Sequence, residues 1–163
     1  MTLDIEQQLK DCQGMNRALT VLAGEASRIL EDLAGTEEAK KIFQEMGESA
    51  GRRFAKKRIE TLGKIDTFGD ALDAIADKAK AWYNIEIDEM LDDCANITVI
   101  NCFIKNILID RGFDIGSPLC GITRGYITGA LEELTGKKAD MKLEVGDLKG
   151  TFRYKICIGR KQN

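Results

Sequence analysis

The N-terminal half of the chain carries apolar residues at spacings of three and four, the period of an α-helix that buries one face. A first stripe runs from Met15 to Leu33, and it is followed by Gly35, a residue suited to ending a helix. A second stripe begins after Thr36, whose hydroxyl can cap a helix start, and continues to Phe54. The pattern therefore predicts two long helices in succession.

A third and shorter stripe predicts a helix that begins at Asp66 or Thr67 and continues to Ala79. From Ala81 the apolar period changes from about 3.6 to 2, which is typical of strands. Two runs rich in aromatic and β-branched residues meet at 92–93, where two aspartates favour a turn. This segment predicts an antiparallel hairpin.

The next apolar run, 103–108, fits a short helix that Gly112 can close because glycine readily adopts positive φ. Ser117 and Pro118 then form a strong helix start, because a serine oxygen accepts an unpaired backbone N–H and proline suits the first turn. The helix is expected to run to Gly136.

Two further strands are predicted at 141–145 and 151–158, with their turn at 146–150. Four strands and four or five helices predict a single α+β domain over residues 1–163. In this domain the N-terminal helices and the long helix at 118–135 pack on a four-stranded antiparallel sheet.

The charge balance is close to neutral: 24 basic and 27 acidic residues give a formal charge of −3. This balance argues against a nucleic acid partner, which strongly cationic surfaces attract. A basic run from Arg52 to Lys64 is typical of a solvated helix face. No apolar stretch approaches the ~20 residues of a membrane span, and the acidic N-terminus is unlike a signal peptide. We expect a cytoplasmic protein.

The chain has no histidine and five cysteines. The absence of histidine excludes the Ser–His and Cys–His pairs of nucleophilic hydrolases. The cysteines form an odd, irregular set without a Cys-x-x-Cys pair, which is unlike a secreted disulfide framework. We therefore expect reduced thiols.

Two glycine pairs lie inside predicted helices, Gly47 with Gly51 and Gly125 with Gly129. Each such glycine costs about 0.5–1 kcal/mol relative to alanine, so a compensating interaction is expected. Residues four apart share a helix face, and each pair opens a flat groove there. The groove can admit either the backbone of a neighbouring helix or the body of a ligand.

Two cysteines suggest a metal site. Cys120 is expected in the first turn of the helix at 118–135, where the helix dipole favours a thiolate, and Cys102 ends a predicted strand and can reach the same region. A zinc site would still lack two ligands, to be supplied by Cys94, a carboxylate, water or a second subunit. The alternative is that both cysteines are buried and act as small apolar groups.

The stretch 120–136, CGITRGYITGALEELTG, resembles the 4-vinyl reductase domain family, often described as hydrocarbon-binding proteins. Asn101 with Cys102, and the segment 43–54 with its two glycines, fit the same family pattern. The resemblance covers most of the chain after about residue 36. It implies a relation in fold to vesicle-tethering complex subunits and to haem-type nitric-oxide sensor domains, an apolar cavity and a dimer.

Many members of this family carry a Cys-His pair at the helix start and two cysteines in the last hairpin, which are thought to hold a metal. Here Gly121 stands in place of the histidine, and Gly146 and Tyr154 stand about where the hairpin cysteines would align. Of that set, Cys102 and Cys120 remain. The apolar cavity implied by the resemblance needs none of the missing residues.

Three hypotheses follow. In the first, the chain is a binding or sensing domain without catalysis, in which Phe54, Phe103 and Tyr126 line an apolar cavity and the two glycine pairs let a ligand approach the backbone. In the second, Cys102 and Cys120 hold zinc or iron in a reductase-type or redox protein. In the third, the chain is a structural subunit that forms a homodimer through the helical segment 1–35.

Overall fold

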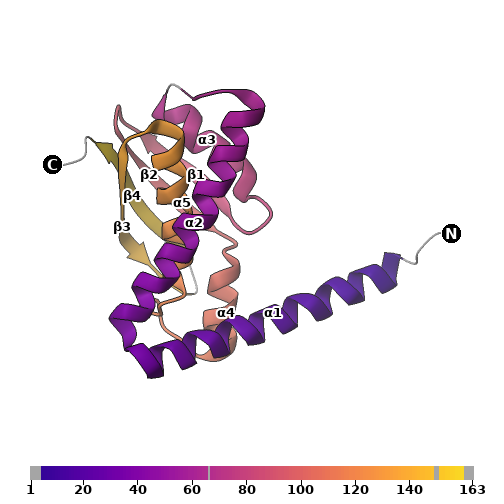
Figure 1. Cartoon of the computed structure of the whole chain (residues 1–163). Helices are drawn as coiled ribbons and strands as arrows, with labels where there is room; N and C mark the ends of the chain where they lie inside the picture. Colours follow the sequence, from indigo (N-terminus) through magenta and orange to yellow (C-terminus); the bar gives the residue numbers. More distant parts are fainter. Residues whose placement is uncertain (1–4, 66, 149–150, 160–163) are drawn as a thin grey trace.

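The computed structural model describes residues 5–65, 67–148 and 151–159. It has the α+β class that the sequence predicts, with helices packed on an antiparallel sheet (Figure 1). The helices are α1 (Ile5–Ala34), α2 (Thr36–Leu62), α3 (Phe68–Ala79), α4 (Phe103–Arg111) and α5 (Cys120–Thr135). The strands are β1 (Asn84–Met90), β2 (Cys94–Ile100), β3 (Lys138–Gly146) and β4 (Phe152–Gly159).

The sheet contains both predicted hairpins, joined by pairing between β2 and β4. Its strand order is β1-β2-β4-β3, and all three pairings are antiparallel. Side chains along β4 alternate between buried and more exposed positions, and those at Phe152, Tyr154, Ile156 and Ile158 enter the core. The core is therefore on one face of the sheet. There α5 lies between the sheet and α2 (Figure 1).

Helix α1 begins about three turns before its predicted start at Met15. The added residues are mainly polar and give only a sparse apolar row, although glutamine, leucine and lysine favour helix. Figure 1 shows the N-terminal half of α1 extending away from the rest of the molecule. Every described side chain from Gln7 to Leu19 is exposed.

Two of the predicted helix caps are wrong. Helix α2 begins at Thr36 itself, with Gly35 as its N-cap at φ 81°, and the Thr36 hydroxyl donates to the Glu31 carboxylate at 2.6 Å instead. Ser117 makes no side-chain cap for α5. The chain enters that helix through a tight turn, in which the N–H of Cys120 donates to the Ser117 carbonyl at 3.1 Å.

Other predicted helix ends are confirmed. The Thr67 hydroxyl accepts a hydrogen bond from the N–H of Asp70 at 3.1 Å and caps α3, whereas the alternative start, Asp66, lies outside the described residues. Gly112 and Gly136 close α4 and α5 at φ 67° and 68°. In the last turn of the sheet, Gly150 also lies outside the described residues.

The expectation that the thiols are reduced is wrong for Cys94 and Cys157, which form a disulfide. The two residues lie directly opposite each other on β2 and β4. They are 63 positions apart in the chain, so only the pairing of two separate hairpins brings them together. Cys12, Cys102 and Cys120 are free thiols.

Candidate ligand-binding cleft

The two glycine pairs bring the backbones of α2 and α5 into direct contact. A Cβ atom on Gly47 or Gly51 would overlap backbone atoms of α5, and one on Gly125 or Gly129 would overlap backbone atoms of α2. Gly121 extends the α5 face by one turn, where a Cβ atom would lie in tight contact with the α2 backbone, 3.0 Å from the Lys40 carbonyl oxygen. The groove beside these glycines therefore admits the backbone of a neighbouring helix, which is the first of the two roles that the sequence left open.

This contact fixes the position of Tyr126. Its amide nitrogen lies against Gly47 and its carbonyl oxygen against Gly51, so the start of its side chain is held close to α2. The ring stacks on Phe54, with centroids 6.1 Å apart, and meets the ring of Trp82 edge-on at 5.2 Å. Such aromatic pairs add about 0.5–1.5 kcal/mol beyond simple burial. Tyr126 thus joins α5, α2 and the segment that follows α3.

A cleft of about 750 Å³ opens beside this aromatic group. Four helices and the segment 81–83 form its walls. Its lining is Asn16, Leu19, Thr20 and Ala23 of α1, Met46, Gly47, Ala50 and Arg53 of α2, Ala81, Trp82 and Tyr83, Phe103, Asn106 and Ile107 of α4, and Ile122, Thr123 and Tyr126 of α5. The volume is within the range of about 300–1,000 Å³ that is usual for small-molecule sites.

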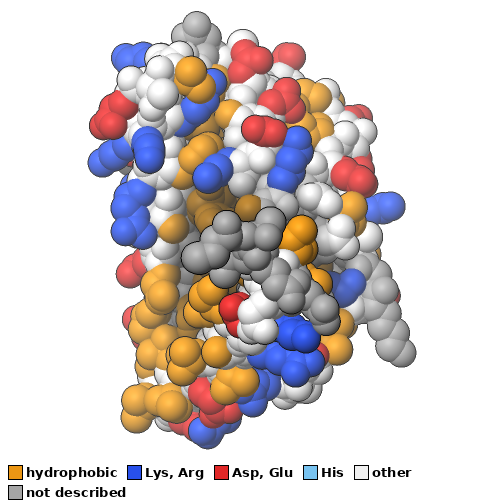
Figure 2. Space-filling model, turned by 90° about the vertical axis from the view of Figure 1, so that its right-hand side faces the viewer, with side chains coloured by type: hydrophobic (Ala, Val, Ile, Leu, Met, Phe, Trp, Pro, Cys, Tyr) orange, Lys and Arg blue, Asp and Glu red, His pale blue; other side chains and the backbone are white. Residues whose placement is uncertain are grey.

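The lining of the cleft is mainly apolar and partly open to water. Leu19, Met46, Trp82 and Phe103 are each more than a third exposed, which is unusual for large apolar side chains gathered at one place. Figure 2 views the molecule from the side towards which α1 projects, and hydrophobic side chains gather there around a hollow. This clustering favours a binding surface over chance exposure.

Two phenolic hydroxyls lie buried in residues that line the cleft. Tyr83 is 2% exposed and Tyr126 is 4% exposed, and neither hydroxyl has a hydrogen-bond partner among the described residues. Burial raises the pKa of both groups, that of Tyr126 to about 12, and the proximity of Tyr126 raises the pKa of Tyr83 further. Both hydroxyls are therefore neutral near pH 7 and each can donate one hydrogen bond.

Backbone hydrogen bonds hold Trp82 and Phe103 side by side. The N–H of Trp82 donates to the Ala79 carbonyl at 2.7 Å, which extends the end of α3 by a turn. The N–H of Phe103 donates to the Trp82 carbonyl at 3.2 Å. Asn101, at φ 54°, makes the bend that leads from β2 into α4. Asparagine adopts this left-handed conformation more readily than most residues.

The predicted ligand-binding residues lie in three places. Gly47, Phe103 and Tyr126 line the cleft. Phe54 stacks on Tyr126 and supports it. The remaining three, Gly51, Gly125 and Gly129, lie in the contact between α2 and α5. Sequence reasoning missed Trp82, Tyr83 and Met46. For Trp82 and Tyr83 the available signal was an aromatic pair at the end of a predicted helix, which was interpreted as the start of a strand.

The predicted metal ligands do not fit a zinc centre. Cys102 and Cys120 line a void of about 10 Å³, and Cys102 Sγ lies 3.8 Å from Thr123 Oγ1. Within residues 5–65, 67–148 and 151–159 there is no group of three His, Cys, Asp or Glu side chains suited to a metal. Zinc normally takes four such ligands, or three and a water.

The surroundings of Cys120 do not favour the expected thiolate. Burial raises the pKa of this thiol to about 11, with a further contribution from Cys102. The thiol is therefore protonated near pH 7.

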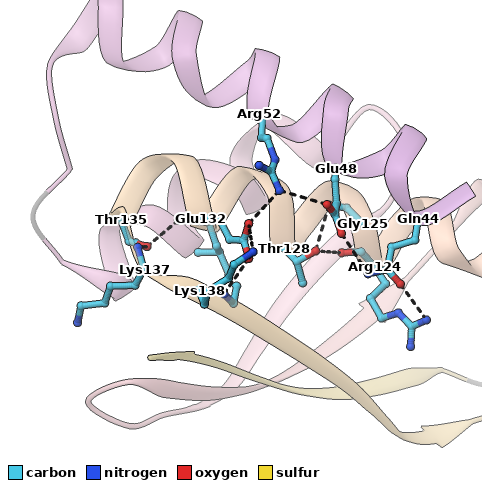
Figure 3. Close-up of polar contacts among 12 residues, drawn as sticks. Gln44, Glu48, Arg52, Arg124, Gly125, Thr128, Glu132, Thr135, Lys137 and Lys138 are labelled. Carbon is cyan, nitrogen blue, oxygen red and sulfur yellow. Dashed lines mark hydrogen bonds and ion pairs between the residues drawn. The ribbon is translucent and has the colours of Figure 1, made fainter. Parts of the chain in front are cut away.

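A polar cluster around Glu132 ties α5 to α2 and to β3 (Figure 3). The Glu132 carboxylate accepts hydrogen bonds from Arg52 at 2.9 Å and from the N–H of Ala139 at 3.3 Å, and it pairs with Lys138 at 3.1 Å. Arg52 also pairs with Glu48 at 3.1 Å. Because the side chain of Glu132 is only 16% exposed, water screens these interactions less than it would at an open surface.

None of the described helices is long and apolar enough to cross a bilayer.

No protein-family model and no curated protein matches the chain. Solved structures share its fold. The phenol-responsive sensory domain of the transcription activator PoxR, crystallised with phenol, is 18% identical, with a TM-score of 0.73 over 88% of this chain and 76% of that chain. Trafficking protein particle complex subunit 3 from Naegleria fowleri, covalently bound to palmitic acid, is 15% identical, with a TM-score of 0.66 over 91% of this chain and 97% of that chain.

These likenesses show the fold alone. The second structure confirms the expected relation in fold to vesicle-tethering complex subunits. Membership of the 4-vinyl reductase family, and the relation to haem-type nitric-oxide sensor domains, stay predictions.

Proposed function

We propose that this chain is a binding or sensing domain for a small and mostly apolar molecule that carries a hydrogen-bonding group. The observation that carries the proposal is the cleft of about 750 Å³, walled by Trp82, Phe103 and Tyr126. Binding sites of this kind combine an apolar lining with a few well-placed polar groups. No reaction is assigned to the cleft.

The unpartnered hydroxyls of Tyr83 and Tyr126 support a polar group on the ligand, which would meet either oxygen by a turn of the tyrosine ring, because both oxygen atoms are closed to solvent in the free protein. A buried hydroxyl without a partner costs about 1–3 kcal/mol, and a ligand oxygen that accepted its hydrogen bond would recover part of this cost. A hydrocarbon without such an atom would leave both hydroxyls unpaired. The proposed ligand therefore has an apolar body and an oxygen at one end.

Both structural neighbours are described with an organic molecule of this general kind. The sensory domain of PoxR was crystallised with phenol, and the trafficking complex subunit carries palmitic acid. A shared fold does not imply a shared ligand, so these neighbours support the class of ligand and not its identity. The alternative of a metal-dependent reductase has no comparable support, because Cys102 and Cys120 do not supply a fitting donor set.

Trp82 gives a direct test, because it is the one tryptophan of the chain and it lines the cleft. Its fluorescence should change saturably when the protein is titrated with phenol, hexanol or palmitic acid as probes. Extraction of the natively purified protein, followed by mass spectrometry, would identify any molecule that is carried along. Saturable binding of at least one probe, or a stoichiometric extracted molecule, is the expected result.

Two variants on the same helix separate cleft binding from non-specific effects. Met46 lines the cleft and is 56% exposed, whereas Leu62 is 67% exposed and is not part of the lining. Met46→Glu places a charge in the cleft and should weaken probe binding at least tenfold, and Leu62→Glu should leave it unchanged. Equal loss in both variants, or no saturable response in the unmodified protein together with no extracted molecule, would overturn the proposal.

A further inference from the structure

Helix α1 presents an apolar row that the rest of the chain leaves uncovered. The row, called here the α1 seam, consists of nine exposed positions at alternating spacings of three and four. They are Ile5, Gln8, Cys12, Met15, Leu19, Leu22, Ala26, Ile29 and Leu33. The row spans four heptads, and every position in it except Gln8 is apolar.

The α1 seam is separate from the face through which α1 joins the molecule. Gly24 and Ser27 are buried on that other face, and Leu30 packs against the core. Arg111 of α4 holds the same region, through the Glu25 carboxylate at 3.2 Å and the Val21 carbonyl at 3.3 Å. The fold therefore uses one face of α1 and leaves the seam free.

The period of the seam indicates what kind of structure covers it. An apolar row with a period of 3.5 residues, sustained over three to four heptads, is the pattern that packs against another helix in a coiled coil. Helix α1 is 30 residues long, and its N-terminal half makes little contact with the rest of the molecule (Figure 1). Helices in water draw most of their stability from packing, so this half needs a partner helix.

We propose that the partner is α1 of a second copy of this chain, in a parallel two-stranded coiled coil. A twofold pairing is self-complementary, since each seam residue meets its own counterpart. The large side chains of Leu19, Leu22 and Ile29 then form matched layers, with one narrow layer at Ala26. Gln8 is a single polar position of the kind that fixes the register of a coiled coil.

The charges along the seam favour the parallel orientation. One edge of the seam carries Asp11, Glu25 and Asp32, and the other carries the uncharged residues Leu9, Asn16, Ala23 and Leu30. In a parallel pair, each acidic edge lies beside the uncharged edge of its partner. In an antiparallel pair, the two acidic edges would face each other and repel. Arg28 lies 3.2 Å from both Glu25 and Asp32 and offsets part of this repulsion, so the charges favour the parallel pair by a small margin.

The pairing also borders the cleft. Leu19 belongs to both the seam and the cleft lining, so the second α1 would run along the α1 wall of the cleft. The proposal does not depend on a ligand, because the seam, its period and its flanking charges are present in the chain alone.

Cys12 provides a built-in test of orientation, because it is an exposed free thiol at a seam position. In the parallel pair the two Cys12 side chains meet, so mild oxidation of the purified protein should join the copies by a disulfide that Cys12→Ser abolishes. Sedimentation equilibrium should show a dimer at micromolar concentration. A monomer at this concentration would overturn the pairing, and a dimer that does not cross-link through Cys12 would overturn the parallel arrangement.

A matched pair of variants tests the seam itself. Leu22 is 66% exposed within the seam, and Val21 is 49% exposed beside it. Leu22→Glu should weaken dimer formation at least tenfold, whereas Val21→Glu should not change it. The fluorescence of Trp82 reports whether each variant keeps its fold. A dimer that Leu22→Glu leaves intact would rest on another surface and would overturn the proposal, independently of probe binding in the cleft.

Discussion

A methyl group added to Gly51 would overlap the carbonyl oxygen of Tyr126, because α2 and α5 touch backbone to backbone at this point. Gly51→Ala should therefore destabilise the protein by at least about 1–3 kcal/mol, the usual cost of overpacking a filled core. Gly14→Ala is the control, since nothing lies within 4 Å of the added atom on an exposed helix. Alanine there should be neutral or stabilising by up to about 1 kcal/mol. Urea unfolding measures the stability of both variants. Equal changes in the two would contradict the role of Gly51 in packing α2 against α5.

The elements of the fold were predictable because their signals are local. Apolar periodicity found the helices and both hairpins, and Gly112 and Gly136 end helices at positive φ as expected. The predictions failed where several neighbouring residues suited the same role. Thr36 and Ser117 are both good caps by residue type, but Gly35 and a tight backbone turn begin those helices instead.

The cleft was predictable only in part, because a site built from several elements depends on long-range packing. Phe103 and Tyr126 were found as aromatic residues in predicted helices. Trp82 and Tyr83 were missed, because their place in the cleft depends on how the end of α3 meets α4 and α5. The disulfide between Cys94 and Cys157 was missed for the same reason, since the pairing of β2 with β4 has no local signal.

The carboxylate of Glu132 should contribute measurably to stability. It is only 16% exposed and accepts hydrogen bonds from Arg52 and from the backbone of Ala139. The variant Glu132→Ala should lower the free energy of unfolding by about 1.5–3 kcal/mol, which is usual for the loss of hydrogen bonds to a charged group. Asp77 pairs with Lys80 at an open surface, and Asp77→Ala should leave the urea midpoint unchanged. A similar result for both variants would show that the cluster around Glu132 is not stabilising.

The disulfide between β2 and β4 should stabilise the domain by restricting the unfolded chain. Its cysteines are 63 positions apart, and closing a loop of this length is worth about 4 kcal/mol in the chain-entropy model. The free energy of unfolding of the double variant Cys94→Ser/Cys157→Ser should be about 2–4 kcal/mol lower than that of the unmodified protein. Dithiothreitol should lower the urea midpoint of the unmodified protein to a similar extent and leave that of the variant unchanged. A midpoint unaffected by dithiothreitol would mean that the bond is absent or contributes nothing.

The tyrosines should titrate abnormally at high pH. Burial raises the pKa of all three, Tyr83, Tyr126 and Tyr154, that of Tyr126 from 10.0 to about 12. Because the folded pKa lies above the unfolded value, the stability from the neutral hydroxyls is present below pH 10 and is lost as the pH rises towards 12. Absorbance at about 295 nm should show tyrosinate near pH 10 only in guanidinium. A tyrosinate signal at that pH in the folded protein would place a hydroxyl in water.

The hydroxyls of Tyr83 and Tyr126 should affect the free and ligand-bound protein in opposite directions. Both are buried without a partner, so Tyr126→Phe should leave the stability of the free protein unchanged or raise it. If the hydroxyl meets the oxygen of a ligand, the same variant should weaken phenol binding roughly tenfold and leave toluene binding unchanged. Tyr154→Phe is the control, because Tyr154 is buried outside the cleft lining. Equal weakening for phenol and toluene would show that the ring of Tyr126 matters only through its shape.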